Sequence, residues 1–151
     1  MIQRIQTIYI LLAVAALTSL FFIDLGHISG EIGLVNITFY SVVDAINGGV
    51  LIYLWPLAIM LSITTLLSFL AIFLYRNRLL QMRVSTICAT LSIALAIIML
   101  LSNILVANSL DMNWHFHWSL SLPLVSSILL IGAYGKIRKD EELIRSLNRL
   151  R

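Results

Sequence analysis

The chain has 151 residues, of which 60% are hydrophobic and 11% are charged, and its mean hydropathy is +1.00. Soluble domains carry about 25% charged residues, so this composition excludes an ordinary soluble domain and indicates an integral membrane protein. Ten Lys and Arg residues outnumber seven Asp and Glu residues, and the meaning of this basic balance depends on where those residues lie along the chain.

The first apolar stretch predicts a membrane-spanning helix over residues 5–23. It contains no Asp, Glu, Lys or Arg, and it reaches the roughly 18 residues that a bilayer span requires. Arg4 and the Ala-Val-Ala pattern that starts at Ala13 also fit a cleavable signal peptide. We favour the span, because the apolar run continues to Ile23 and no polar stretch precedes the cleavage pattern.

Residues 24–49 form the only sizeable connection between the predicted spans, and we expect them outside the cytoplasm. The segment IGLVNITFYSVV is rich in β-branched and aromatic residues, which favour strands, and Gly30 and Glu31 suit a tight turn. A short β-hairpin over the mouth of the helices is one interpretation. An irregular loop and a short interfacial helix are the alternatives that the same residues leave open.

Two further uncharged stretches predict spanning helices over residues 50–75 and 84–110. Pro56 falls in the first turn of the former helix, where its missing amide hydrogen costs little. Along the latter, small and polar residues recur in steps that place them on one face, which lets helix backbones approach closely. These residues are Ser85, Ala89, Ser92, Ala96, Asn103 and Ala107.

Asn103 is the most polar residue well inside a span, and we interpret its amide as an interhelical hydrogen bond rather than a ligand contact. A shorter small-residue face is expected on the second span, at Ala58, Ser62 and Thr65. No span contains an internal acid or base, which argues against proton-coupled transporters and ion pumps.

A fourth helix is predicted over residues 118–135, and a charged tail follows over residues 136–151. A helix with Asp140 as its N-cap would carry two acids, Glu141 and Glu142, at its positive N-terminal end. Its negative C-terminal end would carry the bases Arg145, Arg149 and Arg151. We therefore predict a separate amphipathic C-terminal helix. Its apolar stripe needs a surface, which the inner leaflet, the chain's own helices or a partner would provide; the stripe consists of Leu143, Leu147 and Leu150.

The basic residues fall in three places: before the first span, between the second and third spans, and after the fourth. They are Arg4, Arg76, Arg78, Arg83, Lys136, Arg138, Lys139, Arg145, Arg149 and Arg151. With four spans these places share one face, which the positive-inside rule assigns to the cytoplasm. We predict an all-α membrane protein of one domain over residues 1–151, a four-transmembrane-helix bundle in a bacterial inner membrane with both termini in the cytoplasm. No nucleic-acid partner is expected.

Polar residues on the opposite face raise the hypothesis of a metal site. His115 and His117 would share a face of an extended segment, and Asp111 and His27 are predicted on the same side of the membrane. Imidazole and carboxylate groups together suit a transition metal. We favour the competing interpretation, in which histidines between two tryptophans anchor the chain at the headgroup boundary.

Motifs for catalysis or cofactor binding are not found. Cys88, the single cysteine, has no histidine near it in sequence, and the serines are spread over apolar spans. The sequence contains neither a glycine-rich phosphate loop nor a paired carboxylate motif. We therefore expect neither an enzyme nor a cofactor.

Three stretches carry a resemblance to a known family: MIQRIQTIYILLA, PLAIMLSITTLLSFLAIFLYRNRLLQMR and IRKDEELIRSLNRLR. Over essentially its full length the chain resembles a family of small integral membrane proteins of Bacteroidetes, classed as a domain of unknown function. The matching positions are Arg4, Gln6, Phe73, Asn77, Arg78, Gln81, Arg138, Lys139, Asp140, Glu141, Arg145, Arg149 and Arg151.

Near its end that family tends to read Ser-Ala-Asp, where this chain has Ser146, Leu147 and Asn148. This departure removes one acid and puts any role for that carboxylate in doubt. The resemblance implies a four-helix inner-membrane protein with both termini in the cytoplasm, and it implies no activity.

Two functional hypotheses follow. The first is a noncatalytic scaffold or accessory subunit whose basic cytoplasmic rim binds a cytoplasmic or membrane protein partner, or the anionic lipid of the inner leaflet. Its binding residues would be Arg76, Asn77, Arg78, Gln81, Arg138, Lys139, Arg145, Arg149 and Arg151. The alternative is a binder or carrier of a small apolar or metal ligand at the outer mouth formed by His27, Asp111, His115 and His117.

Overall fold

The computed structural model describes residues 2–30, 33–46 and 48–149. Its long helices are α1 (Ile2–Ser19), α2 (Trp55–Phe73), α3 (Arg78–Ser109) and α4 (Ser121–Arg149). Short 3-10 helices cover Leu74–Arg76 and Trp118–Leu120. The strands are β1 (Gly26–Gly30), β2 (Gly33–Ile37), β3 (Ser41–Asp44), β4 (Val50–Tyr53) and β5 (Asn113–Trp114).

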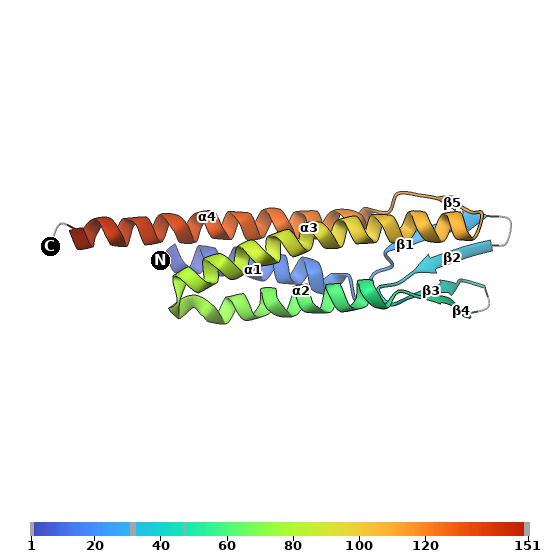
Figure 1. Cartoon of the computed structure of the whole chain (residues 1–151), viewed down its shortest axis with the longest axis horizontal. Helices are drawn as coiled ribbons and strands as arrows, with labels where there is room; N and C mark the ends of the chain where they lie inside the picture. The colour runs from blue at the N-terminus through green and yellow to red at the C-terminus, as the bar shows by residue number, and fades with distance from the viewer. Residues whose placement is uncertain (1, 31–32, 47, 150–151) are drawn as a thin grey trace.

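The long helices lie side by side, and the sheet lies at one end of them (Figure 1). α1 contacts α2 and α4, and α3 contacts the same two helices. The start of α1, the connection between α2 and α3, and the end of α4 all lie at the end opposite the sheet. We call this end the basic end, because the Lys and Arg residues of α3 and α4 belong to it. The other end is the sheet end.

Three helical segments are long and apolar enough to cross a membrane: Trp55–Phe73, Arg78–Ser109 and Trp118–Glu142. This finding is consistent with the predicted membrane protein. Over its described side chains, α1 is apolar along Ile5–Ser19, which at 1.5 Å per residue is shorter than a hydrocarbon core of about 30 Å. The four-span topology therefore stays a prediction.

Two predicted helices are shorter than expected at the sheet end. α1 ends at Ser19 rather than near residue 23, because the amides of Leu20, Phe21 and Phe22 bond to the carbonyl three residues earlier and form a turn. Residues 50–53 form β4 instead of the first turns of α2. The helix begins at Trp55, next to Pro56, whose fixed backbone suits a first turn.

The predicted hairpin is part of a larger antiparallel sheet with the strand order β4-β3-β2-β1-β5. β1 and β2 pair from Gly26 with Ile37 to Gly30 with Gly33, so the hairpin turns where we predicted it, although Glu31 lies outside the described residues. Gly33 has φ +130, a conformation that side chains with a Cβ rarely adopt. β5 comes from the segment before α4, so the two connections that we predicted outside the cytoplasm form one sheet.

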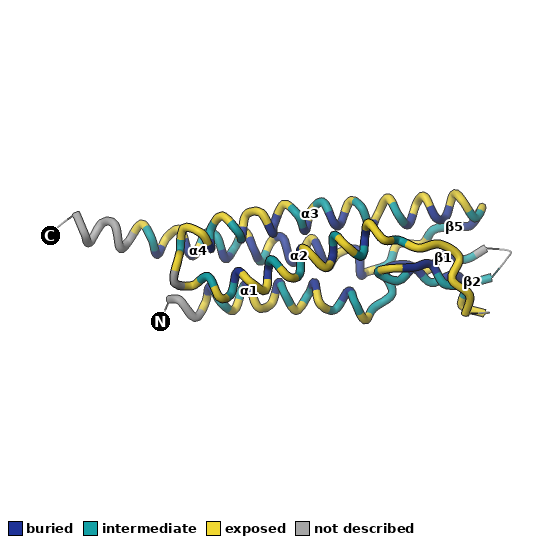
Figure 2. Tube along the Cα trace, turned by 60° about the horizontal axis from the view of Figure 1, so that its bottom comes forward, coloured by how far each residue is buried: buried dark blue, intermediate teal, exposed yellow. Residues whose placement is uncertain are grey.

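Two hydrophobic clusters hold these layers together. At the sheet end, strand residues such as Ile28, Ile37 and Val42 share a core with Leu95 and Met99 of α3. Nearer the basic end the helices meet through mostly small residues: Ile10, Ala13, Ala71, Cys88, Ala89, Leu130 and Ala133. Buried and exposed positions alternate along every long helix (Figure 2), so each helix has one inward face.

All residues of the predicted small-residue face of α3 are buried: Ser85, Ala89, Ser92, Ala96, Asn103 and Ala107. The expected face of α2 is wrong, since Ser62 is exposed. The inward residues of α2 are instead Leu57, Leu61, Thr64, Ser68 and Ala71. Leucines take the positions nearest the sheet because α2 packs there against the larger core that the strands share.

Among the described residues, Asn103 has no partner for the interhelical hydrogen bond that we predicted. Its Nδ2 donates to the Met99 carbonyl oxygen of its own helix at 2.8 Å. Its Oδ1 lies against Gly26 of β1, where an added Cβ would collide with it. The amide of Asn103 thus sets how closely β1 approaches α3.

Replacing Gly26 by Ala should lower the free energy of unfolding by about 1–3 kcal/mol, because overpacking would force β1 away from α3. Thermal unfolding in detergent measures this change. Gly49→Ala is the matched control, since a Cβ at Gly49 meets no atom within 4 Å. Equal melting temperatures for the two variants would contradict the close approach of β1 to Asn103.

Candidate functional site

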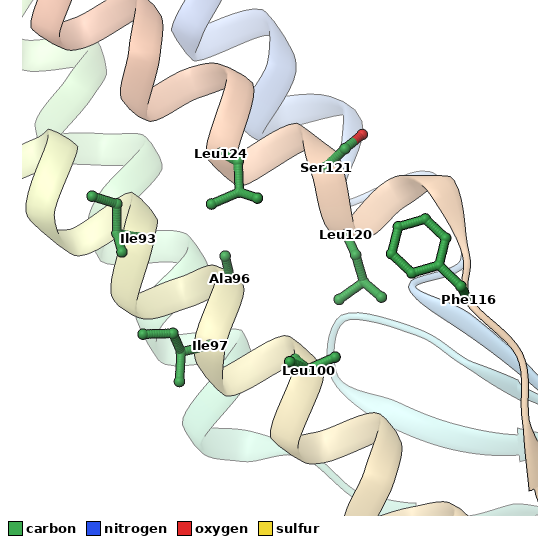
Figure 3. A pocket seen from close by; sticks show the side chains of 8 residues that line it. All are labelled: Ile93, Ala96, Ile97, Leu100, Phe116, Leu120, Ser121 and Leu124. Carbon is green, nitrogen blue, oxygen red and sulfur yellow. The ribbon is translucent and has the colours of Figure 1, made fainter.

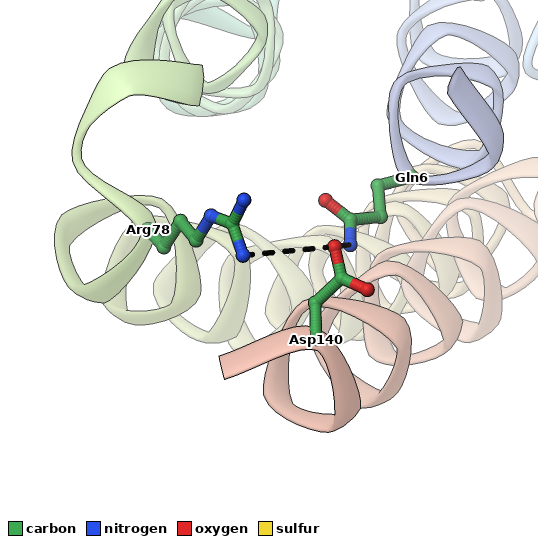
Figure 4. A network of polar contacts seen from close by, with 3 residues as sticks. All are labelled: Gln6, Arg78 and Asp140. Carbon is green, nitrogen blue, oxygen red and sulfur yellow. Dashed lines mark hydrogen bonds and ion pairs between the residues drawn. The ribbon is translucent and has the colours of Figure 1, made fainter. Parts of the chain in front are cut away.

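Polar side chains from three helices meet at the basic end, and Figure 4 shows them pointing toward one another. Nε2 of Gln6 in α1 donates to Oδ2 of Asp140 in α4 at 3.1 Å. Nη1 of Arg78, the first residue of α3, lies 3.7 Å from the same oxygen. A single carboxylate oxygen therefore joins three helices. We call Gln6, Arg78 and Asp140 the Asp140 cluster.

Burial makes the Asp140 cluster a structural contact. Gln6 and Asp140 are buried, and the Arg78 side chain is 24% exposed. A charge that is removed from water needs a partner, and here the carboxylate and the guanidinium are each other's partner. The cluster accounts for an acid in a segment that is otherwise rich in Lys and Arg.

Asp140 is not the N-cap of a separate tail helix, so that prediction is wrong. α4 runs without a break through Ser121–Arg149 and places Asp140 in its interior. Amides in a helix interior already have intrahelical partners, and the Asp140 side chain is therefore available to contact α1 and α3. The stripe predicted for the tail falls on side chains outside the described part of the structure: Leu143, Leu147 and Leu150.

Gln81 ties α3 to the end of α2. Its Nε2 donates to the Ala71 carbonyl oxygen at 3.2 Å. α2 ends at Phe73, and the last carbonyl groups of a helix lack intrahelical partners, so the Gln81 amide supplies one. Gln81 is 3% exposed. This geometry gives Arg78 and Gln81, which we predicted on a binding surface, contacts inside the protein.

Exposed cations remain around these contacts. Arg83, Lys136 and Lys139 are exposed, and within the part of the chain that the structure describes none of them forms an ion pair. We call these three residues the basic rim. They sit on α3 and α4, whose ends the Asp140 cluster holds together.

The other predicted rim residues differ in their surroundings. Asn77 is exposed. Nε of Arg138 donates to Oε1 of Glu142 at 2.9 Å, and both side chains are 61% exposed, so this pair is fully in solvent. Arg151 lies outside the described residues, as do the side chains of Arg76, Arg145 and Arg149.

At the sheet end the structure brings together two of the four predicted metal ligands. The rings of His27 and His117 meet edge to face, with their centroids 4.9 Å apart. Nε2 of His115 lies 3.0 Å from Oγ of Ser29, and Asp111 is exposed. Among the described residues, no group of three His, Cys, Asp or Glu side chains is placed to hold a metal ion. The metal hypothesis therefore gains no support from the geometry.

His117 belongs to a hydrogen-bonded chain that ties α4 to the sheet end. Its Nδ1 lies 2.8 Å from Oγ of Ser119, which donates to the Leu25 carbonyl oxygen at 3.1 Å. The backbone N–H of Ser119 also donates to this Nδ1, at 3.5 Å, so His117 caps the short 3-10 helix that leads into α4. Burial and the neighbouring His27 lower the pKa of His117, while Asp24 opposes them. The neutral ring is thereby favoured, as suits a packing contact.

An apolar pocket of about 270 Å³ opens between α3 and α4 toward the sheet end (Figure 3). Its lining residues are Ile93, Ala96, Ile97, Leu100, Phe116, Leu120, Ser121 and Leu124. None of the four predicted metal ligands lines it. The pocket suits an apolar group rather than a metal ion.

One family matches the chain over residues 2–150, and its description is "Domain of unknown function (DUF4293)". No curated protein matches the chain. The matched range covers the Asp140 cluster, the basic rim and both outer segments, so all of these features lie within the family's domain.

Replacing Asp140 by Asn should lower the free energy of unfolding by about 1–3 kcal/mol, because Arg78 would keep a partly buried charge without an acidic partner. Chemical or thermal unfolding in detergent measures this loss. Glu142→Gln is the matched control: it also removes one acid, but from a pair that is 61% exposed, and its effect should stay within about 0.5 kcal/mol. If the two variants were equally stable, the Asp140 cluster would not be a stabilising contact.

Proposed function

We propose that this chain, which belongs to the DUF4293 family, a domain of unknown function, is a noncatalytic membrane scaffold or accessory subunit. In this proposal it presents the basic rim to an acidic surface. The observation that carries this proposal is the gathering of exposed cations at the basic end, which form no ion pair within the described part of the chain and sit on helices whose ends the Asp140 cluster fixes.

Four spans fit the packing better than three. α1 lies alongside α2 and α4 and contacts both, so a membrane around those two helices also surrounds α1. Its outward residues include Ile8, Leu11 and Leu12, which are about half exposed and suit contact with lipid. Local bilayer thinning accommodates a span that is somewhat short.

The charges support an orientation with the basic end in the cytoplasm of a bacterial inner membrane. Lys and Arg concentrate on the cytoplasmic side of membrane proteins, and Trp marks the interfaces. At the sheet end Trp55 and Trp118 are 64% and 54% exposed, as expected for rings at a headgroup boundary. Both termini and the connection between α2 and α3 are then cytoplasmic.

The basic rim is suited to bind an acidic surface. Each Lys or Arg near an anionic leaflet contributes roughly 1 kcal/mol of attraction, and the same charges attract an acidic protein. Arg83, Lys136 and Lys139 need not first break an ion pair within the described chain. Scaffolding fits such a surface because its charges rest on a fixed frame of helices.

The contacts of the polar residues favour a noncatalytic role. Gln6, Gln81 and Asp140 are among the most polar buried side chains, and each is engaged in joining helices. His117 and Ser119 join α4 to the sheet end in the same way. These groups contact structural partners, whereas a catalytic group would face a substrate cavity.

The apolar pocket between α3 and α4 favours a second candidate function, the binding or carrying of a small apolar ligand. Its location near Phe116 agrees with a site toward the outer mouth. Its lining differs from the histidines that we predicted there, so the ligand would be held by apolar contacts alone.

The scaffold proposal predicts that copurification depends on the basic rim. A triple variant with Arg83→Gln, Lys136→Gln and Lys139→Gln should lose at least fivefold of the proteins and anionic lipids that copurify with the natural chain in mild detergent, as measured by mass spectrometry. The control combines Arg138→Gln with Glu142→Gln, which leaves the net charge unchanged. Identical sets of bound molecules in the triple variant and the control would refute a binding role for the rim.

A further inference from the structure

A second groove lies between α3 and α4 close to the basic end, with a volume of about 460 Å³. It is lined by Leu79, Met82, Arg83, Thr86, Ile87 and Tyr134. Neither Arg83 nor Tyr134 was among the residues that the sequence predicted for binding, because the groove forms only when α3 and α4 pack together.

The groove has an apolar part and a cationic part. Leu79 and Ile87 expose about half of their surface, and Met82 lies between them on the chain. Oγ1 of Thr86 donates to the Met82 carbonyl oxygen at 3.0 Å, so its hydroxyl is used by its own helix. Arg83 brings a positive charge to an otherwise mostly apolar surface.

Arg83 carries the one charge among the residues that line the groove, and no acid is among them. Tyr134 interacts electrostatically with Arg138, whose guanidinium is paired with Glu142. The charge of Arg83 is therefore not offset by any acid among the lining residues, and it complements an anion.

We propose that this groove binds an anionic phospholipid of the cytoplasmic leaflet, with the phosphate at Arg83 and the start of an acyl chain against Leu79, Met82 and Ile87. The inference rests on the proposed membrane placement, in which the basic end faces the cytoplasm. Basic pockets between membrane-spanning helices on that side bind acidic lipid headgroups. Tyr134 suits the same depth, since tyrosines favour the interface.

The apolar part and the cationic part of the groove together distinguish among possible ligands. A free phosphate ion would satisfy Arg83 and leave the apolar part of the groove unused. A zwitterionic lipid would fill the apolar part but would bring its own cation close to a positive surface. An anionic phospholipid is complementary to both parts.

Native mass spectrometry of the whole chain in detergent tests the proposal, with phosphatidylglycerol and phosphatidylcholine titrated separately. The natural chain should bind phosphatidylglycerol about tenfold more tightly than the Arg83→Gln variant does, which is the change expected from one charge-assisted hydrogen bond. Lys139→Gln removes the same charge from the basic rim outside the groove, and it should change binding less than twofold.

Thr86→Trp provides a second variant that fills the groove and leaves every charge in place. It should reduce lipid binding as strongly as Arg83→Gln, and unfolding curves establish that both variants fold. A titration with inorganic phosphate alone separates the lipid from the free ion.

Equal losses of lipid affinity in Arg83→Gln and Lys139→Gln would overturn the groove as the lipid site. The basic rim would then be a diffuse lipid-binding surface, and the proposed function would stand. Equal binding of the two lipids by the natural chain would overturn the role of charge. Binding of inorganic phosphate with the same dependence on Arg83, unaffected by Thr86→Trp, would overturn the lipid as the ligand.

Discussion

The structure depends on keeping charge out of the middle of its helices. α2 has no acid or base, α3 has none after Arg83, and α4 has none before Lys136. Several of the polar groups that remain are satisfied within their own helix: the hydroxyls of Ser92 and Ser102 donate to the carbonyl one turn earlier, at 2.9 and 2.8 Å. Hydrocarbon offers no other partner for such groups. Charged contacts are thereby restricted to the two ends.

The two ends use different means to fix the helices. At the basic end the Asp140 cluster joins α1, α3 and α4, and Gln81 joins α3 to α2. At the sheet end a hydrophobic core shared by strands and helices fixes the helices, together with the hydrogen bonds of His117 and Ser119. The exposed cations therefore sit on helices whose ends are held by buried polar contacts, whereas the sheet end relies mainly on apolar burial. This difference is why we place the binding function at the basic end.

The sequence allowed three helices of membrane-spanning length and the buried face of α3 to be predicted, because composition and helical spacing decide both. Less of the sheet could be predicted from the sequence. β5 pairs with β1 across more than eighty residues of chain, and no local pattern records such a partner. Asp140 looked like an N-cap because acids and then bases follow it. Only the packing of Gln6 and Arg78, both distant in sequence, shows its contact. Arg78 and Gln81 looked like surface residues for the same reason.

We propose that four helices cross the membrane with the basic end in the cytoplasm. Labelling of spheroplasts with a membrane-impermeant maleimide tests this topology, in a Cys88→Ala background that removes the only native thiol. Single cysteines replace the exposed residues Ala45 and Lys139, and a third is added before Met1. We expect labelling at position 45 in spheroplasts, and labelling at position 139 and before Met1 only after permeabilisation. A thiol before Met1 that reacts from outside would show that α1 does not span, and a reactive position 139 with a protected position 45 would reverse the orientation.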